Sequence, residues 1–355
     1  MTSLLEPVHF PSGLVAKNRV ALAPMTNQQS NADGSLSEAE LAWLRRRARG
    51  GFGIVMTCAA HVSADGQGWP GELGVFDDRL QPGLERLAQA LRTDGAASIV
   101  QIFHGGVRAD TKASGLPSIS SSAAEGARAA TEEDLERVIR DFGQAARRAE
   151  AAGFDGVELH GAHGYLFTQF LSTTQNQRTD QWGGSLENRA RLLLRAFDEV
   201  RKHTSRKFTV GVRLSPENFG NAKGLDLDES LQVARWLSER ELDFLHLSLW
   251  EALRNTTKRP DEHALPLFRS AVGPKVPLLV AGKIWTRAEA EQLLALGADG
   301  VALGRSGILN PDWPLQIASA SFEPLRPPVT IEQLRSLDLS PPFAEYMRRW
   351  QGFVV

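Results

Sequence analysis

The stretch VELHGAHGYL, residues 157–166, places His160, His163 and Tyr165 within six residues of one another. The chain has only eight histidines and two tyrosines among its 355 residues, so this grouping calls for a chemical explanation. Two imidazoles on one turn can donate hydrogen bonds to the same oxygen atom, and a neighbouring phenol can supply a proton. We therefore expect His160 and His163 to polarise a substrate oxygen, with Tyr165 as a general acid beside them.

Two other interpretations of these histidines stay open. His160 and His163 could bind a metal ion with His104 as a third ligand, as in a metal-dependent lyase or hydrolase. Such a site would need a carboxylate or a third imidazole close by. Strand alternation predicts that Glu158 points away or, at best, shares the side of His160 without reaching past it. Alternatively, both imidazoles are core side chains with satisfied hydrogen bonds. Of the three interpretations we favour the pair of hydrogen-bond donors and expect no metal.

Further candidates lie at the ends of other apolar runs. Arg213 stands inside GVRLS, where a guanidinium would cost several kcal/mol to bury unpaired, so we expect it to meet an anionic ligand group or, alternatively, a structural carboxylate. Gly282 and the pair Gly304-Arg305 follow two later runs. Glycine there lets backbone amides approach a phosphate, although it is also ordinary turn chemistry.

The elements that would position these residues follow a regular order of short apolar runs and longer amphipathic segments. The runs lie at residues 19–24, 53–58, 98–103, 156–160, 208–214, 243–249, 277–282 and 300–304, and helical patterns lie near 37–50, 84–94, 131–152, 185–203, 229–241, 263–272 and 286–297. Apolar strands that alternate with helices predict an α/β fold with a parallel sheet buried on both faces. Eight such units, without a GxGxxG turn after the first, favour a (β/α)8 TIM barrel, whose strand ends meet at one mouth.

Two segments interrupt this order. Residues 105–130 form a Gly/Ser/Ala-rich stretch that we expect to cross the barrel mouth. Residues 324–355 follow the barrel of residues 1–323 as a Pro-rich tail, which we expect to pack on the barrel or at a subunit interface. The tail ends MRRWQGFVV, and Arg348, Arg349 and Trp350 are of residue types enriched at interface cores, although a solvated helix end is the alternative.

Composition narrows the class of partner. The formal charge is −2, with 40 basic and 42 acidic residues, so neither a nucleic acid nor an anionic membrane is an expected partner. No long apolar run and no signal-peptide pattern is present, and we expect a cytoplasmic protein that acts on small molecules. Cys58, the single cysteine, stands in the apolar run GIVMTC and predicts a buried structural thiol.

Four segments carry a resemblance to a known family: KNRVALAPMT (17–26), HGAHGYLFTQFLS (160–172), RTDQWGGSLENRARLLLRAFDEV (178–200) and ADGVALGRSGILNPDWP (298–314). Together they resemble the old yellow enzyme family of FMN-dependent NAD(P)H:flavin oxidoreductases, in its short single-domain branch. The resemblance implies a barrel with tightly bound, non-covalent FMN and NADPH or NADH as reductant. It implies ping-pong reduction of the C=C bond of enones, maleimides or nitro compounds, in a homo-oligomer. As in part of the family, Arg348 or Arg349 could reach the site of a neighbouring subunit.

The resemblance also implies residue roles. The cofactor would contact Pro24, Met25, Thr26, Ala59, Ala60, Gln101, His160, Arg213, Gly282, Lys283, Gly304 and Arg305. The substrate would contact His160, His163, Tyr165, Gln28, Trp69 and Trp250, with Tyr165 as the proton donor. Thr26, Gln28 and Trp182 depart from residues that are usual in the family, and Val107 displaces Arg108, whose role stays open. The alternatives are a denitrating, oxidising or isomerising activity of the same barrel, or a flavin-binding module without catalysis.

Overall fold

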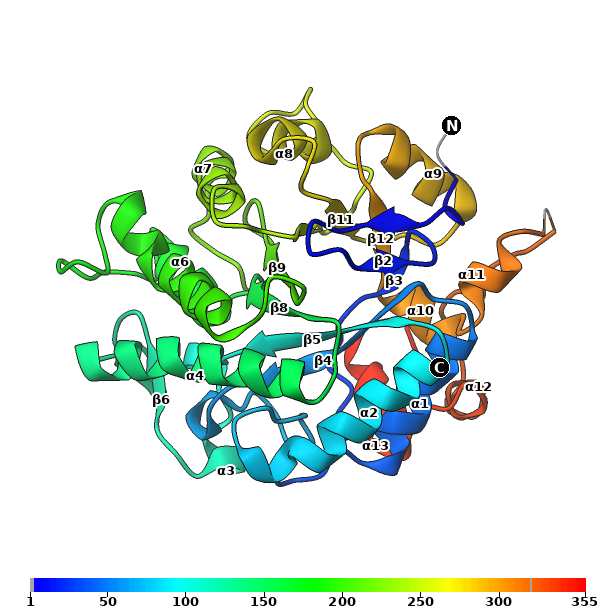
Figure 1. The fold of residues 1–355 in the computed structure, drawn as a ribbon, viewed down its shortest axis with the longest axis horizontal. Helices are drawn as coiled ribbons and strands as arrows, with labels where there is room; N and C mark the ends of the chain where they lie inside the picture. Colours follow the sequence, from blue (N-terminus) through cyan, green and yellow to red (C-terminus); the bar gives the residue numbers. More distant parts are fainter. Residues whose placement is uncertain (1–2, 320) are drawn as a thin grey trace.

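The computed structural model describes residues 3–319 and 321–355. Eight parallel strands close a barrel in the order β10-β11-β12-β3-β4-β5-β8-β9 (Figure 1). They are β3 (Val20–Leu22), β4 (Ile54–His61), β5 (Ala97–Phe103), β8 (Gly156–Gly161), β9 (Thr209–Leu214), β10 (Phe244–Ser248), β11 (Leu278–Ala281) and β12 (Gly300–Leu303). Each overlaps one of the eight apolar runs, so the predicted (β/α)8 barrel is confirmed.

Seven helices form the outer layer and match the seven amphipathic patterns. They are α1 (Glu38–Arg49), α2 (Gln81–Thr93), α4 (Glu132–Ala151), α6 (Leu186–His203), α7 (Leu227–Ser238), α8 (Ala264–Val272) and α9 (Arg287–Ala295). Two of them begin with a capping box. The side chain of Thr131 or Thr286 accepts a hydrogen bond from the backbone N–H three residues later, and the acidic side chain there accepts one from the backbone N–H of the threonine. These boxes explain why the helices begin where they do.

The strands separate two layers of side chains. Val20 and Leu22 face the helices, whereas Ala21 and Ile54 belong to a smaller cluster inside the barrel. At the amino end of the strands, the hairpin of β1 (Val8–His9) and β2 (Val15–Ala16) adds Phe10 to this inner cluster. Because the inner cluster fills this end of the barrel, the opposite end is where a ligand can enter.

The segment after β5 and the C-terminal tail each consist of short helices or strands that pack on the barrel. The first holds α3 (Thr111–Ser114) and the paired strands β6 (Ser118–Ser120) and β7 (Ala127–Ala129). The second holds α12 (Ile331–Ser336) and α13 (Pro341–Tyr346). The remaining short helices are α5 (Leu166–Leu171), α10 (Arg305–Leu309) and α11 (Trp313–Gln316). Within the described ranges, no helix combines the length and the apolar character needed to cross a bilayer.

Candidate functional site

A cavity of about 350 Å³ opens at the carboxyl ends of the barrel strands. Each of the eight strands, or the loop directly after it, supplies part of its lining. Fifteen of the residues expected from the sequence line it: Pro24, Met25, Thr26, Ala59, Trp69, Gln101, His160, His163, Tyr165, Arg213, Trp250, Gly282, Lys283, Gly304 and Arg305. The barrel therefore gathers residues that lie up to 281 positions apart in the sequence, from Pro24 to Arg305.

Two expected residues are not part of this lining. Ala60 is fully buried in the cluster between the strands and the helices, because successive side chains of β4 point to opposite faces and Ala59 is the one that faces the cavity. Gln28 occupies a turn with φ +53° beyond the strand end and does not reach the cavity wall. Ala60 and Gln28 therefore lie outside the lining of this cavity.

The lining also contains residues that the sequence did not single out for it. Ser248 is the last residue of β10, and Phe219, Gly220 and Asn221 come from the loop after β9. The tail contributes Tyr346, Met347 and Trp350. Serine and asparagine after an apolar strand were a usable signal, whereas the position of the tail depends on tertiary packing that no local pattern encodes.

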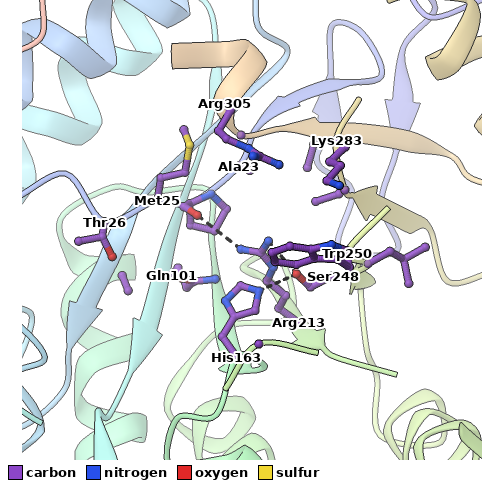
Figure 2. Close-up of a pocket in the computed structure, with 18 of the residues that line it drawn as sticks. Ala23, Met25, Thr26, Gln101, His163, Arg213, Ser248, Trp250, Lys283 and Arg305 are labelled. Atoms are coloured by element: carbon purple, nitrogen blue, oxygen red, sulfur yellow. Dashed lines mark hydrogen bonds between the residues drawn. The ribbon is translucent and has the colours of Figure 1, made fainter. Parts of the chain in front are cut away.

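A chain of hydrogen bonds joins three of these side chains (Figure 2). Arg213 Nη2 lies 3.1 Å from Ser248 Oγ, which lies 2.6 Å from His163 Nε2. Arg213 can only donate, and His163 is the acceptor that the described residues offer to the hydroxyl hydrogen of Ser248. The chain therefore runs from Arg213 through Ser248 to His163 Nε2, which leaves the ring hydrogen of neutral His163 on Nδ1.

Both imidazoles of the pair are uncharged at neutral pH. Their rings meet edge to face with centroids 4.9 Å apart. Burial lowers the pKa of each well below its usual range, and the neighbouring His163 adds to the effect on the pKa of His160, as Arg213 does for the pKa of His163. Neutral imidazoles keep one N–H each, so the pair can donate two hydrogen bonds without adding charge.

The backbone at His163 is held in an unusual conformation. Its φ is +63°, in the left-handed region that non-glycine residues seldom adopt. Ser215 Oγ accepts from its N–H at 3.2 Å, and Arg108 Nη1 donates to its carbonyl oxygen at 2.7 Å. Contacts on both sides of the residue thus fix the direction of the imidazole.

Tyr165 stands at the edge of the same corner. Its ring packs edge to face on Phe103 with centroids 5.0 Å apart, and the Arg108 guanidinium lies 4.3 Å from the centre of the ring. Burial raises the pKa of Tyr165 to about 12, and the positive charge of Arg108 opposes that rise. The phenol therefore stays protonated at neutral pH and can act only toward a strongly basic acceptor.

Glu158 lies on the same side of β8 as His160, which is the second of the two positions that the sequence left open for it. Residues two apart on a strand share a face, and Glu158 is fully buried inside the barrel. Its carboxylate accepts hydrogen bonds from Gln101 Nε2 at 2.6 Å and from His246 Nδ1 at 2.8 Å. One amide hydrogen of Gln101 is therefore occupied, and its carbonyl oxygen stays available to a ligand.

His104 does not join the histidine pair. Its Nδ1 accepts from the Gly106 backbone N–H at 3.0 Å, and its Nε2 faces Asp65 at 3.5 Å. Among residues 3–319 and 321–355, no group of three or more His, Cys, Asp or Glu side chains is arranged around a common point. The three-histidine metal site considered above therefore has no geometric support.

Cys58 is buried, as its apolar run predicts.

The ends of β11 and β12 form the opposite corner of the cavity. Gly282 has φ +154°, and a Cβ there would lie 2.5 Å from the carbonyl oxygen of Leu249, so only glycine fits. Arg305 lies under the ring of Trp350, 5.6 Å from its centre. Lys283 pairs with Glu251 and lies 5.4 Å from the centre of the Trp250 ring, so its charge is already compensated.

Several polar atoms of the lining residues are buried without a partner. Within the part of the chain that the structure describes, these are Trp69 Nε1, His160 Nδ1, Arg213 Nε and Ser306 Oγ. Buried polar groups are normally hydrogen-bonded, so these atoms indicate a polar ligand. Arginines at both ends of the cavity suit an anionic ligand, and the aromatic and aliphatic walls suit a planar ring. The residues present thus fit a flavin mononucleotide.

Comparisons with known proteins agree with this geometry. Residues 3–321 match the model of the NADH:flavin oxidoreductase / NADH oxidase family. The probable NADH-dependent flavin oxidoreductase YqiG of Bacillus subtilis is 38% identical, with 99% of this chain and 97% of that protein covered. An old yellow enzyme homologue from Zymomonas mobilis superposes with a TM-score of 0.84 at 28% identity, with 97% of this chain and 99% of that one covered. A morphinone reductase gives 0.81 at 26%, with 97% and 96% covered.

Proposed function

Because the chain belongs to the NADH:flavin oxidoreductase / NADH oxidase family, as one of its old yellow enzymes, we propose that it is an ene-reductase for activated alkenes such as enones and maleimides. Its cofactor is FMN and its reductant is NAD(P)H, and enzymes of this type reduce C=C bonds. The observation that carries the proposal is the corner formed by His160, His163 and Tyr165 in the barrel mouth. Two neutral donors and one protonated acid are what reduction of a polarised alkene requires.

The cavity would hold the cofactor between its two ends. Gly282, Gly304 and Arg305 would receive the phosphate, and Gln101 and Arg213 would face the polar edge of the ring system. Arg213 keeps its charge there, since burial lowers its pKa only to about 10. Bound FMN, once reduced by NAD(P)H, supplies the hydride equivalent for the alkene.

His160 and His163 would bind the oxygen atom of the activating carbonyl or nitro group. Their N–H groups withdraw electron density through the conjugated system, so the distal carbon becomes electrophilic. The Arg213–Ser248–His163 chain supports this role because it fixes which nitrogen of His163 carries the hydrogen. The left-handed backbone of His163 and its two flanking contacts keep the ring in place.

Tyr165 would protonate the carbon next to the activating group. A phenol whose pKa is about 12 is too weak an acid to protonate the bound substrate in advance. It is still far more acidic than the carbanionic carbon that forms when hydride adds to the alkene, so proton transfer is downhill at that moment. The order of events, hydride first and proton second, follows from this difference.

An absorbance spectrum tests the proposal directly. The purified protein should absorb near ~450 nm, lose that band on anaerobic addition of NADH or NADPH, and regain it when 2-cyclohexenone is added. Saturated cyclohexanone should form in the second step. A protein that stays colourless after incubation with FMN would contradict the roles given to Arg213 and Gly304, and a band that bleaches but does not return would contradict alkene reduction.

We further propose that the chain assembles as a homo-oligomer through its tail. The support is the composition of the tail surface, where Trp350 is 40% exposed beside Arg348 and Arg349. In the single chain, Arg348 pairs with Glu345 and Arg349 lies over the ring of Tyr346. Light scattering should give a multiple of the 38.8 kDa chain mass. A monomer at micromolar concentration would exclude the assembly.

A further inference from the structure

All charged side chains in the lining of the cavity are cationic. They are Arg108, Arg213, Lys283 and Arg305, and the lining contains no Asp or Glu, although the whole chain carries a formal charge of −2. A cavity with one sign of charge raises the local concentration of ligands of the opposite sign. The question is which of these cations remain available for a ligand other than the cofactor.

Three of these four cations already have a partner or an expected ligand. Arg213 bonds the Pro24 carbonyl oxygen and Ser248 beneath the site of the ring system. Lys283 pairs with Glu251. Arg305 stands at the end of the cavity assigned to the cofactor phosphate, under Trp350. Each of these cations therefore has a charge partner, a hydrogen-bonding role or the cofactor phosphate as its expected ligand.

Arg108 is different. Within the described residues no carboxylate oxygen lies within 4 Å of its guanidinium. One N–H of its Nη1 reaches the His163 carbonyl oxygen, and its planar group stacks on Tyr165. The guanidinium has five N–H donors in total, so most of them remain free at the cavity edge. The side chain is exposed there, on the 3-10 turn Gly106–Arg108 after β5.

We propose that Arg108 binds a carboxylate carried by the alkene substrate, so that the preferred substrates are α,β-unsaturated carbonyl compounds with an additional anionic group. This inference rests on the proposed function. A planar guanidinium matches the two oxygens of a carboxylate, and it touches both the residue that donates the proton and a residue that binds the activating oxygen. The phosphates of NAD(P)H are a second source of negative charge. They are separated from the nicotinamide ring by a ribose, which places them away from a group stacked on Tyr165.

A matched pair of esters tests the inference. Dimethyl fumarate and monomethyl fumarate share the alkene and one activating ester, and they differ by one carboxylate. The ratio of kcat/KM for the monomethyl ester to kcat/KM for the dimethyl ester is measured for the wild type and for Arg108→Gln, Arg108→Lys and Lys112→Gln. Lys112 is the control, because it is an exposed cation on the same loop that does not line the cavity.

Arg108→Gln should lower this ratio on the order of tenfold, since a hydrogen bond to a charged group is lost. Arg108→Lys should restore part of it, and Lys112→Gln should leave it unchanged. The intrinsic reactivities of the two esters cancel when the ratio for a variant is compared with the ratio for the wild type, as does any general loss from the broken contact with His163. An equal fall for both esters would overturn the inference, since Arg108 would then only support His163 and Tyr165.

Two further measurements separate the remaining outcomes. Monomethyl succinate cannot be reduced, so its binding, followed by the change in flavin absorbance, tests the anion site even if neither fumarate ester turns over. An unchanged Kd in Arg108→Gln would overturn the inference, whereas failure of the wild type to reduce dimethyl fumarate would count against the proposed function alone. If Arg108→Gln slows only flavin reduction by NADPH and leaves reduction by NADH unaffected, Arg108 binds the phosphate that NADPH carries and NADH lacks. That result would overturn the inference as well.

Discussion

At the scale of single residues, Ser248 is the side chain that determines which ring nitrogen of His163 carries the hydrogen. Its hydroxyl oxygen accepts a hydrogen bond from Arg213, which can only donate. The hydroxyl then donates to His163 Nε2, which must accept. Ser248→Ala should leave His163 Nε2 without a partner and mix its two tautomers. We expect Kd for a carbonyl ligand such as 4-hydroxybenzaldehyde, measured by flavin absorbance, to rise about tenfold. Ser215→Ala, which removes only the contact to the backbone of His163, is the comparison, and equal effects would argue against a tautomer role.

The pH dependence of the second half-reaction follows from the direction of three pKa shifts. The imidazoles of His160 and His163 have lowered pKa values, so they stay neutral down to well below pH 6.5, and Tyr165, with a pKa of about 12, stays protonated above pH 9. None of the three should titrate between pH 6 and 9. Flavin reoxidation by 2-cyclohexenone, followed by stopped flow, should be flat over that range. If the rate of reoxidation instead changes near pH 6.5, one of the two imidazoles titrates there because it is not shielded from water.

Tyr165→Phe separates proton transfer from binding. The ring and its contact with Phe103 are kept, and only the acidic hydroxyl is removed. Reoxidation by the alkene should slow by about 10²- to 10⁴-fold, the range of general acid catalysis, while flavin reduction by NADH should change little. If both rates are unaltered, Tyr165 is not the proton donor and water would be the proton source; if the alkene reoxidises neither the wild type nor the variant, the barrel would be a flavin-binding module without catalysis.

At the scale of elements, the tail is part of the barrel wall. Phe343 of α13 packs edge to face on Trp43 of α1 with ring centroids 5.4 Å apart, and the backbone of Val329 bonds that of Phe353 and Val355. Phe343→Ala should lower the free energy of unfolding by about 3–5 kcal/mol, because a fully buried ring leaves a cavity. Urea denaturation measures this loss. Leu315→Ala, at a side chain that is 60% exposed, should change it by less than about 0.5 kcal/mol.

The elements differ in how far the sequence could predict them. The eight strands and seven outer helices were predictable because burial on two faces or on one leaves a periodic pattern, and capping residues such as Thr131 and Thr286 mark where helices begin. The exposed position of Arg108 and the inward position of Met347 leave no such pattern. They depend on how one loop and one tail lie on the finished barrel, so the sequence left the role of Arg108 open and the residues of the cavity wall incomplete.

At the scale of the whole molecule, the barrel explains why residues remote in sequence could be assigned to one site before its geometry was known. Parallel strands end at one mouth, so the residues after each strand must meet there. The same rule does not say which of two neighbours faces inward. The sequence therefore named both Ala59 and Ala60 and left two positions open for Glu158, since a one-residue shift in the phase of a strand reverses every side chain.

The barrel closes where β12 pairs with β3, through Val301 with Val20 and Leu303 with Leu22. Residues that follow both of these strands line the cavity, so a chain that is unfolded or only half folded does not contain the cavity. A ligand that binds only the closed ring acts through mass action: at a free concentration 100 times Kd it adds about 2.7 kcal/mol to the stability of the entire fold. Molecules that carry FMN would then melt at a higher temperature than molecules without it. The share of a preparation that melts at the lower temperature would report how much of the protein lacks FMN.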